Sequence, residues 1–325
     1  MSMKKETPSD VRLHWAAVNG DVALIRRLLD SGKVHVDCRD KEGTTPLVLS
    51  AANGHFDCVL ELLEQGADPT CQRVTGTTAL FFAAQSGYTD VADLLLKNGA
   101  KVDTASVDGG TPLFVSCQYG HLDTVTLLLD HGAKVNSLMK DGASPLFIAS
   151  QNGYCNVAEL LVSRGAEIDQ RRLDGATPLW IASQMNHPSI VRFLLKFGAN
   201  VNTVRRVNIQ HPYSLPIEEA ISNKERDVHP ISIIFLVSGN SKSLSYSIDN
   251  ILHLFGFSTD CWLFQNGESA LHAAVLFGHA RIVRLLLLAG APANLRNQEG
   301  ATPLDLAIHS KNKPILELLC HHIDL

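Results

Sequence analysis

The chain has 325 residues, a formal net charge of -5, 45% hydrophobic residues and 19% charged residues. This composition is too apolar for a disordered chain, and its charge excludes a strongly basic nucleic-acid binder. No apolar run approaches the roughly 18 residues of a membrane-spanning helix, and residues 1–9 are too polar for a secretory signal. Seven cysteines without close pairs fit reduced thiols. We therefore expect a folded cytoplasmic or nuclear protein with neither a nucleic-acid nor a membrane partner.

One pentapeptide pattern recurs along the chain at an interval of 33 residues. It begins at Gly43, and further copies begin at 76, 109, 142 and 175, with a last pair at 267 and 300. Each copy reads Gly-x-Thr-Pro-Leu with small changes, and Leu-Leu followed by Gly-Ala comes later in most copies. A fixed period of this length indicates a stack of similar supersecondary units.

Each copy predicts two short helices. Thr45 is a suitable N-cap, and Pro46 is a suitable first helical residue because its missing N–H would have no partner there. Gly54 then ends this helix in a left-handed conformation. The segment 59–63 has the apolar spacing of a second helix. Both helices are too short to be stable alone, so neighbouring copies must stack to bury their Leu and Ala side chains.

A unit of 33 residues with Gly-x-Thr-Pro-Leu, Gly-His and Leu-Leu-x-x-Gly-Ala resembles the ankyrin repeat. The resemblance rests on the consecutive copies that begin at 43, 76, 109, 142 and 175. It implies an all-α fold, namely an ankyrin-repeat solenoid of stacked helix-turn-helix units with polar turn tips. It also implies binding of a protein partner.

The copies divide the chain into four parts. Residues 1–9 are an N-terminal tail, 10–203 hold repeats one to six, 204–266 depart from the pattern, and 267–325 hold the last two repeats. The first copy has Arg12 where Pro is expected. Because the terminal repeats of a solenoid need a polar outer face, we expect the first and last copies to be caps.

Residues 204–266 lack Gly-x-Thr-Pro-Leu, although a copy is due at 208. The stretch 216–224 is similar to the first-helix sequence 303–311, and 249–257 has the spacing of a second helix. We favour one degenerate repeat with an insertion of about 25 residues; two degenerate repeats or a mispredicted exon are the alternatives. In each case we expect the weakest joint of the stack here.

A glutamine occupies the same place in four successive repeats, at the C-terminal end of the first helix. In ankyrin proteins this place faces the concave groove. The amides are either ordinary polar groups that face water or one another, or donors and acceptors that grip the backbone of an extended peptide. On the second interpretation, the candidate partner-binding residues are Gln85, Gln118, Tyr119, Gln151, Asn152, Gln184 and Met185.

Aromatic residues follow the motif leucine in four repeats, as Phe81, Phe114, Phe147 and Trp180. We favour packing between successive first helices; the alternative is a partly exposed strip of binding hot spots. The turn tips vary between repeats, and we expect Met139 and Leu173 to be exposed there. Either partner specificity or ordinary surface variation accounts for these tips.

Histidines recur near the start of the second helix, as His55, His121, His187 and His279. Stacked helices lie about 8–10 Å apart, which separates His55 from His121 by about 20 Å, whereas zinc ligands lie at about 2 Å. In ankyrin proteins this residue ties the turn to its neighbour, and we expect that role. The sequence carries no catalytic or nucleotide-binding motif. We expect no metal, no cofactor and no enzymatic activity.

Asparagines end three of the Gly-Ala-x-x-Asn stretches, at Asn136, Asn202 and Asn294. In ankyrin proteins an asparagine there is often a substrate of asparaginyl hydroxylase, so the resemblance implies three candidate hydroxylation sites. The alternative is a structural turn asparagine that bonds its own backbone.

These observations favour a monomeric, non-catalytic scaffold or adaptor. Its protein partner is expected on the concave face of repeats three to six, where the glutamines coincide with variable tips. The alternative function is a substrate-recruiting subunit of an enzyme complex such as a ubiquitin ligase.

Overall fold

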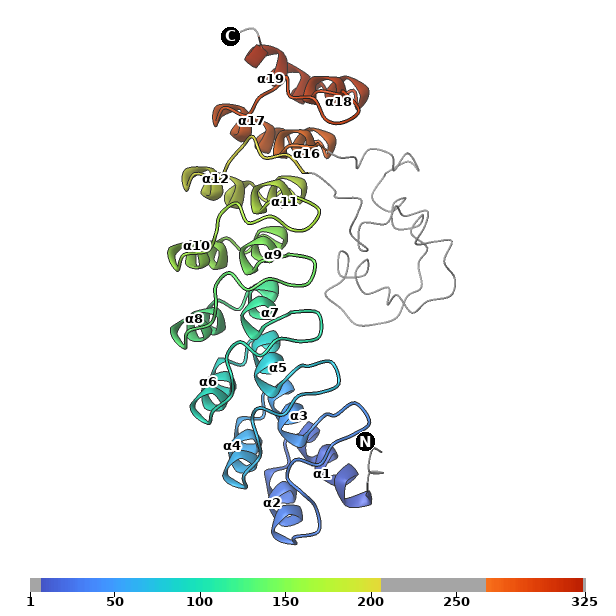
Figure 1. Ribbon diagram of the computed structural model, residues 1–325, viewed down its shortest axis with the longest axis vertical. Helices are drawn as coiled ribbons and strands as arrows, with labels where there is room; N and C mark the ends of the chain where they lie inside the picture. The colour runs from blue at the N-terminus through green and yellow to red at the C-terminus, as the bar shows by residue number, and fades with distance from the viewer. Residues whose placement is uncertain (1–6, 206–266, 324–325) are drawn as a thin grey trace, which may run out of the picture.

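The computed structural model describes residues 7–205 and 267–323, whose helices stack into one elongated solenoid (Figure 1). Every named element in these residues is an α-helix. Val204 and Ser269 pair as an isolated antiparallel β-bridge. The predicted all-α solenoid is confirmed.

Within the described residues the helices form two parallel columns, and each repeat adds one helix to each column (Figure 1). The inner column consists of α1 (Pro8–Asn19), α3 (Pro46–Ala52), α5 (Ala79–Ser86), α7 (Pro112–Tyr119), α9 (Pro145–Asn152), α11 (Pro178–Gln184), α16 (Ala270–Leu276) and α18 (Pro303–His309). The outer column consists of α2 (Val22–Asp30), α4 (Phe56–Glu64), α6 (Thr89–Lys97), α8 (Leu122–Asp130), α10 (Cys155–Ser163), α12 (Pro188–Lys196), α17 (Ala280–Leu288) and α19 (Lys313–Ile323).

The predicted start and stop signals form the helices as expected, and α7 shows them all. The Thr111 hydroxyl accepts the N–H of Phe114 at 3.2 Å, and Pro112 is the first helical residue. Gly120 ends the helix in the left-handed conformation, with a φ of 76°. Because each signal is local, the repeat sequence itself determines where the helix begins and ends.

The hydrophobic core runs between the two columns along the whole stack. The motif leucines Leu80, Leu113, Leu146 and Leu179 are fully buried there. Each helix packs against its pair and against the next repeat of its own column. Stability is therefore the sum of contacts between neighbours, as in other solenoids.

The loop from each outer helix to the next inner helix forms a narrow finger. In one finger, the Arg172 N–H donates to the Ala176 carbonyl at 2.9 Å and the Gly175 N–H donates to the Arg172 carbonyl at 2.8 Å. The Leu173 N–H also donates to the carbonyl of Asp141 in the preceding finger, at 2.8 Å. Backbone bonds thus close each finger and join it to its neighbour.

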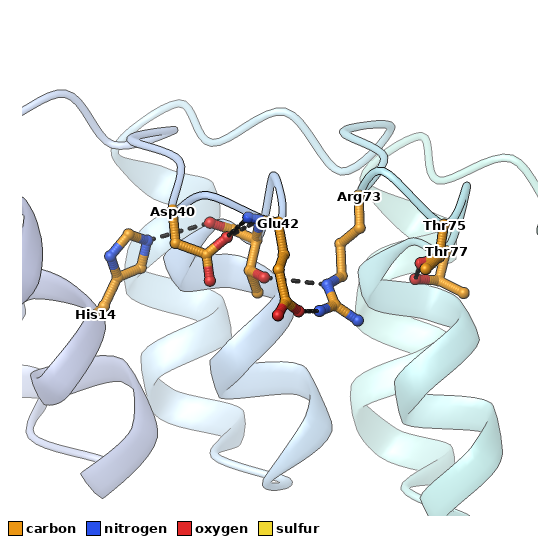
Figure 2. A network of polar contacts seen from close by, with 7 residues as sticks. His14, Asp40, Glu42, Arg73, Thr75 and Thr77 are labelled. Atoms are coloured by element: carbon orange, nitrogen blue, oxygen red, sulfur yellow. Dashed lines mark hydrogen bonds and ion pairs between the residues drawn. The ribbon is translucent and has the colours of Figure 1, made fainter. Parts of the chain in front are cut away.

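Side chains strengthen the first two fingers (Figure 2). The Asp40 carboxylate accepts the N–H groups of Glu42 and Thr44 at 2.8 and 2.7 Å. Arg73 reaches back from the next finger, where it donates to the Thr44 hydroxyl at 3.0 Å and forms an ion pair with Glu42. His14 bonds to the Thr44 carbonyl from the inner helix below, at 3.2 Å.

Residues 206–266 lie outside the described residues, and so does most of the predicted degenerate repeat with its insertion. The repeats on either side are stacked directly on one another, with α16 against α11 and α17 against α12. His279 Nε2 donates to the Gln184 carbonyl at 2.9 Å, across this join. Within the described residues, no further helix pair therefore stands between the sixth repeat and the repeat that begins at Gly267.

The first repeat differs from its prediction at its start. The helix α1 begins at Pro8, two residues before the expected boundary at residue 10. Thr7 and Asp10 cause the difference, because they form a capping box in which each side chain accepts the other residue's N–H, at 3.2 and 2.8 Å.

The expected polar cap is wrong for the inner helix of this repeat. Val11, Trp15 and Val18 form an exposed apolar face of α1, and Trp15 is 58% exposed. The residue equivalent to Trp15 is Val115 in the fourth repeat, where it is 3% exposed. The position of Trp15 is therefore covered within the stack, whereas Val18 shares the position of Gln118, which is half-buried. At the other end the exposed residues of α18 are mixed, with Asp305 beside Ile308.

Candidate partner-binding surface

The predicted partner-binding residues lie together at the C-terminal ends of α5, α7, α9 and α11. The four glutamines are half-buried, whereas Tyr119 and Asn152 are exposed and Met185 is half-buried. We call this set the amide row: Gln85, Gln118, Tyr119, Gln151, Asn152, Gln184 and Met185. One copy of the glutamine stands in each of repeats three to six.

The main chain of the amide row is held by the following repeat. His121 donates to the Gln85 carbonyl at 3.0 Å, and His187 donates to the Gln151 carbonyl at 2.9 Å. The Gln118 carbonyl accepts the side-chain amide of Asn152 at 2.7 Å. The predicted role of the recurrent histidine, a tie between neighbouring turns, is confirmed.

The glutamine side chains form fewer hydrogen bonds than the main-chain carbonyls of the same residues. Gln85 donates weakly to the Tyr119 hydroxyl, at 3.4 Å. Among the described residues no hydrogen bond joins two of the four glutamine side chains, so the idea that they bond to one another is wrong. The row therefore combines a fixed backbone with amide groups that are open to an incoming molecule.

Tyr88 and Tyr154 extend this surface, and the sequence reasoning missed both. They occupy the position of the recurrent histidine, which is the signal that could have found them. A Cβ on Gly120 would lie 2.6 Å from the Tyr154 ring, so that ring rests directly on the left-handed glycine of the preceding repeat. His121 rests on Gly87 in the same way and stacks on Tyr119, with ring centroids 6.2 Å apart.

The aromatic residues after the motif leucine belong to the core. Phe114, Phe147 and Trp180 are buried and Phe81 is half-buried, which confirms the packing interpretation over the exposed strip. Arginines of the fingers cover two of them, and the Arg172 guanidinium lies 5.0 Å from the Phe147 ring centroid. Arg205 lies at the same distance from Trp180 and bonds to Asp174.

One finger-tip prediction is wrong. Met139 is half-buried, because its N–H donates to the Ala143 carbonyl at the base of the finger and its side chain lies beside Gly110. Its neighbour Leu138 is exposed instead, and Leu173 is exposed as expected.

The three candidate hydroxylation sites differ in their surroundings. The Asn136 side chain accepts the Glu167 N–H at 2.9 Å and donates to the Gly165 carbonyl at 3.2 Å, so it ties two repeats together. Asn202 and Asn294 are exposed. By its register, Asn202 faces Pro292, which has no N–H to offer.

Burial sets the shifted pKa values of two cysteine thiols and of one carboxyl group. Burial raises the pKa of the Cys58 thiol to about 11 and raises the pKa of Cys117. Both thiols are therefore protonated and poor nucleophiles at neutral pH. Burial also raises the pKa of Glu268 to about 7, with Arg205 acting against this and Glu299 adding to it.

In residues 7–205 and 267–323, no three His, Cys, Asp or Glu side chains come together as metal ligands. No helix in the same residues has the length and apolar character needed to cross a membrane.

Comparison with known proteins agrees with this geometry. The family model for three ankyrin repeats matches residues 13–106, 102–172 and 239–325, and the model for a single ankyrin repeat matches 174–206. The crystal structure of the human ASB11 ankyrin repeat domain is similar, with a TM-score of 0.62 and 25% identity. The match covers 85% of this chain and 98% of the ASB11 chain. The match from 239 extends into the segment for which a degenerate repeat stays a prediction.

Curated relatives match over shorter stretches. Ankyrin repeat domain-containing protein 29 of Homo sapiens is 56% identical over 73 residues, which cover 22% of this chain and 24% of that protein. Its counterpart in Danio rerio is 52% identical over 73 residues, with the same coverage. The 26S proteasome non-ATPase regulatory subunit 10 of Dictyostelium discoideum is 38% identical over 64 residues, 20% of this chain and 28% of that protein. These matches span about a quarter of each relative. The family models, by contrast, cover most of the repeats described above, and the chain belongs to the ankyrin repeat family.

Proposed function

We propose that this chain is a non-catalytic scaffold or adaptor that binds a protein partner along the amide row. The observation that carries the proposal is a difference between the main chain of the row, which is held by hydrogen bonds, and its side chains. The next repeat holds the glutamine carbonyls, while the side-chain amides remain open. A surface fixed in this way loses little entropy on binding, so more of the contact energy appears as affinity.

We further propose the face on which the partner binds, the oligomeric state of the chain and its compartment. The amide row lines the concave face of repeats three to six, and the chain acts as a monomer in the cytoplasm or nucleus. Asn202 and Asn294 are the preferred hydroxylation sites, because both are exposed, whereas Asn136 already bonds to the next repeat.

A second candidate is a subunit that recruits substrates to an enzyme complex. The similarity to a proteasome regulatory subunit favours it. The two candidates differ in the fate of the partner. A recruited substrate becomes more stable in cells when this chain is depleted, whereas the partner of a scaffold keeps its lifetime.

Proximity labelling in cells tests the binding surface. We expect simultaneous replacement of Gln118, Tyr119 and Gln151 by Ala to reduce partner recovery several-fold, with little change in the thermal unfolding midpoint. A matched triple replacement in the outer column, of Glu64, Lys97 and Ser163 by Ala, should leave recovery intact. Equal recovery with both triple variants would overturn the proposal.

A further inference from the structure

The amide row is periodic, and its period restricts what fits it. The glutamine returns once per repeat at Gln85, Gln118, Gln151 and Gln184. Neighbouring helices of a stack lie about 8–10 Å apart. A segment that meets every glutamine must therefore present the same group about every 9 Å.

Three regular backbones can be compared with this spacing. A polyproline II helix has three residues per turn and a rise of about 3.1 Å, so its period is about 9.3 Å. A β-strand presents one face every second residue, at about 6.7 Å, and falls out of step after one repeat. An α-helix uses its carbonyls internally, so it offers no backbone acceptors to a row of amides. Polyproline II has no internal hydrogen bonds, and its carbonyls are free.

Exposed tyrosines supply the second element of such a site. Tyr88, Tyr119 and Tyr154 are 36%, 38% and 36% exposed and stand in three successive repeats. Tyr119 accepts from Gln85, and the Tyr154 ring lies on Gly120, next to Tyr119 in the chain. The Gln85 amide, the Tyr119 ring and the Tyr154 ring therefore lie near one another on one surface. Segments in the polyproline II conformation dock in grooves lined by aromatic rings.

Charge narrows the choice of segment. Asp57, Asp90 and Asp123 are exposed in the first turns of α4, α6 and α8, each two residues after the position that His55, Tyr88 and His121 share. Among the described residues these three carboxylates form no ion pair. They interact favourably with the helix dipole. The equivalent residues of the fifth and sixth repeats are Asn156 and Ser189, so within the four repeats of the amide row only repeats three and four carry this carboxylate. Two cations three residues apart on a polyproline II segment would match Asp90 and Asp123, which stand one repeat apart.

We infer that the amide row, together with Tyr88 and Tyr154, binds a proline-rich segment in the polyproline II conformation that carries two Lys or Arg residues three positions apart. The inference rests on the proposed function and specifies the chemistry of the partner. The amides donate to the free carbonyls, the proline rings pack against the tyrosines, and the cations pair with the carboxylates.

Labelled synthetic dodecapeptides test each part of this inference, with the full chain and fluorescence anisotropy at physiological salt. We expect repeated Pro-Pro-Arg to bind at least about tenfold more tightly than repeated Pro-Pro-Glu or repeated Gly-Ser-Arg. Tyr119→Ala and Gln118→Ala should each weaken binding of the Pro-Pro-Arg peptide. Asp90→Asn with Asp123→Asn should weaken it further, whereas the same change of charge at Glu64→Gln with Asp130→Asn should not.

Each alternative result of this experiment would refute a specific part of the inference. Equal binding of the flexible Gly-Ser-Arg peptide would refute the polyproline II conformation, and equal binding of Pro-Pro-Glu would refute the basic character. If no peptide binds but partner recovery in cells still depends on Gln118, Tyr119 and Gln151, this inference is wrong and the proposed function stands. If recovery is independent of these residues, the proposed function fails as well.

Discussion

The N–H of Gly267 donates to the carbonyl of Arg205 at 2.7 Å, just as Gly175 donates to Arg172 at 2.8 Å in the preceding finger. The Arg205 N–H likewise donates to the Glu268 carbonyl at 2.8 Å. In the regular finger two residues, Leu173 and Asp174, separate the bonded pair, whereas residues 206–266 separate it here. The same backbone bonds thus close a finger whether its tip is short or very long.

Replacement of residues 206–266 by Leu-Asp, the tip of the preceding finger, should leave the stack folded. We expect one cooperative urea transition and an equal or higher free energy of unfolding, by up to about 3 kcal/mol, because closing a long loop costs about 0.6 kcal/mol per doubling of length. Loss of cooperativity would show instead that the replaced residues contribute a repeat to the stack.

Two glycines separate the effect of left-handed strain from that of close packing. Gly120 and Gly132 have φ values of 76° and 82°, but a Cβ on Gly120 would lie 2.6 Å from the Tyr154 ring, whereas nothing lies within 4 Å of one on Gly132. Gly132→Ala should cost about 1 kcal/mol of unfolding free energy, and Gly120→Ala about 2–4 kcal/mol.

Hydrogen exchange should locate the damage from Gly120→Ala. We expect faster exchange in α9 and α10 as well as in α7 and α8, since each repeat is stabilised by its neighbours. An effect of equal size in both glycine variants, or one confined to α7, would contradict the role given to Tyr154.

Glu268 should make stability depend on pH. Burial raises the pKa of this carboxyl from 4.5 to about 7 in the folded chain, so the folded state holds the proton more tightly. Its contribution is complete below about pH 4.5 and is lost as the pH rises to about 7, by up to about 3 kcal/mol. Glu268→Gln should therefore raise the unfolding free energy at pH 8 and have little effect at pH 4.5.

Urea unfolding across this pH range tests the prediction, with Glu299→Gln as the control. Glu299 is exposed and only adds to the shift of Glu268, so its variant should keep most of the pH dependence. A pH profile of Glu268→Gln that matches the parent chain would refute the buried carboxyl as its source.

The three asparagines should differ in their contribution to the free energy of unfolding and in how readily they are hydroxylated. Asn136→Ala removes two hydrogen bonds to the next repeat and should cost about 1–2 kcal/mol, whereas Asn202→Ala should cost almost nothing. When the chain is treated with an asparaginyl hydroxylase, mass spectrometry should find Asn202 and Asn294 modified before Asn136. Preferential modification of Asn136 would mean that its tie to Glu167 opens readily.

Local signals in the sequence predict the fold well. Thr111, Pro112 and Gly120 act within one turn of the chain, so their spacing is enough to place a helix. The amide row was also predictable, because a residue that returns every 33 positions must lie in line along a stack.

Features that depend on two repeats at once were harder to predict. Met139 is half-buried although we expected it to be exposed, because its side chain lies beside Gly110 of the preceding finger. The placement of the Tyr88 and Tyr154 rings depends on the glycine that each ring contacts in the preceding repeat. Neither relationship is visible within a single copy of the motif.

The open face of α1 has a consequence for how such an array grows. A repeat packed against α1 would cover Trp15, which is apolar and exposed, and so would gain burial at once. An addition after α19 would first have to take the Asp305 carboxylate of α18 out of water. A unit placed against α1 therefore needs fewer compensating substitutions than a unit placed against α18.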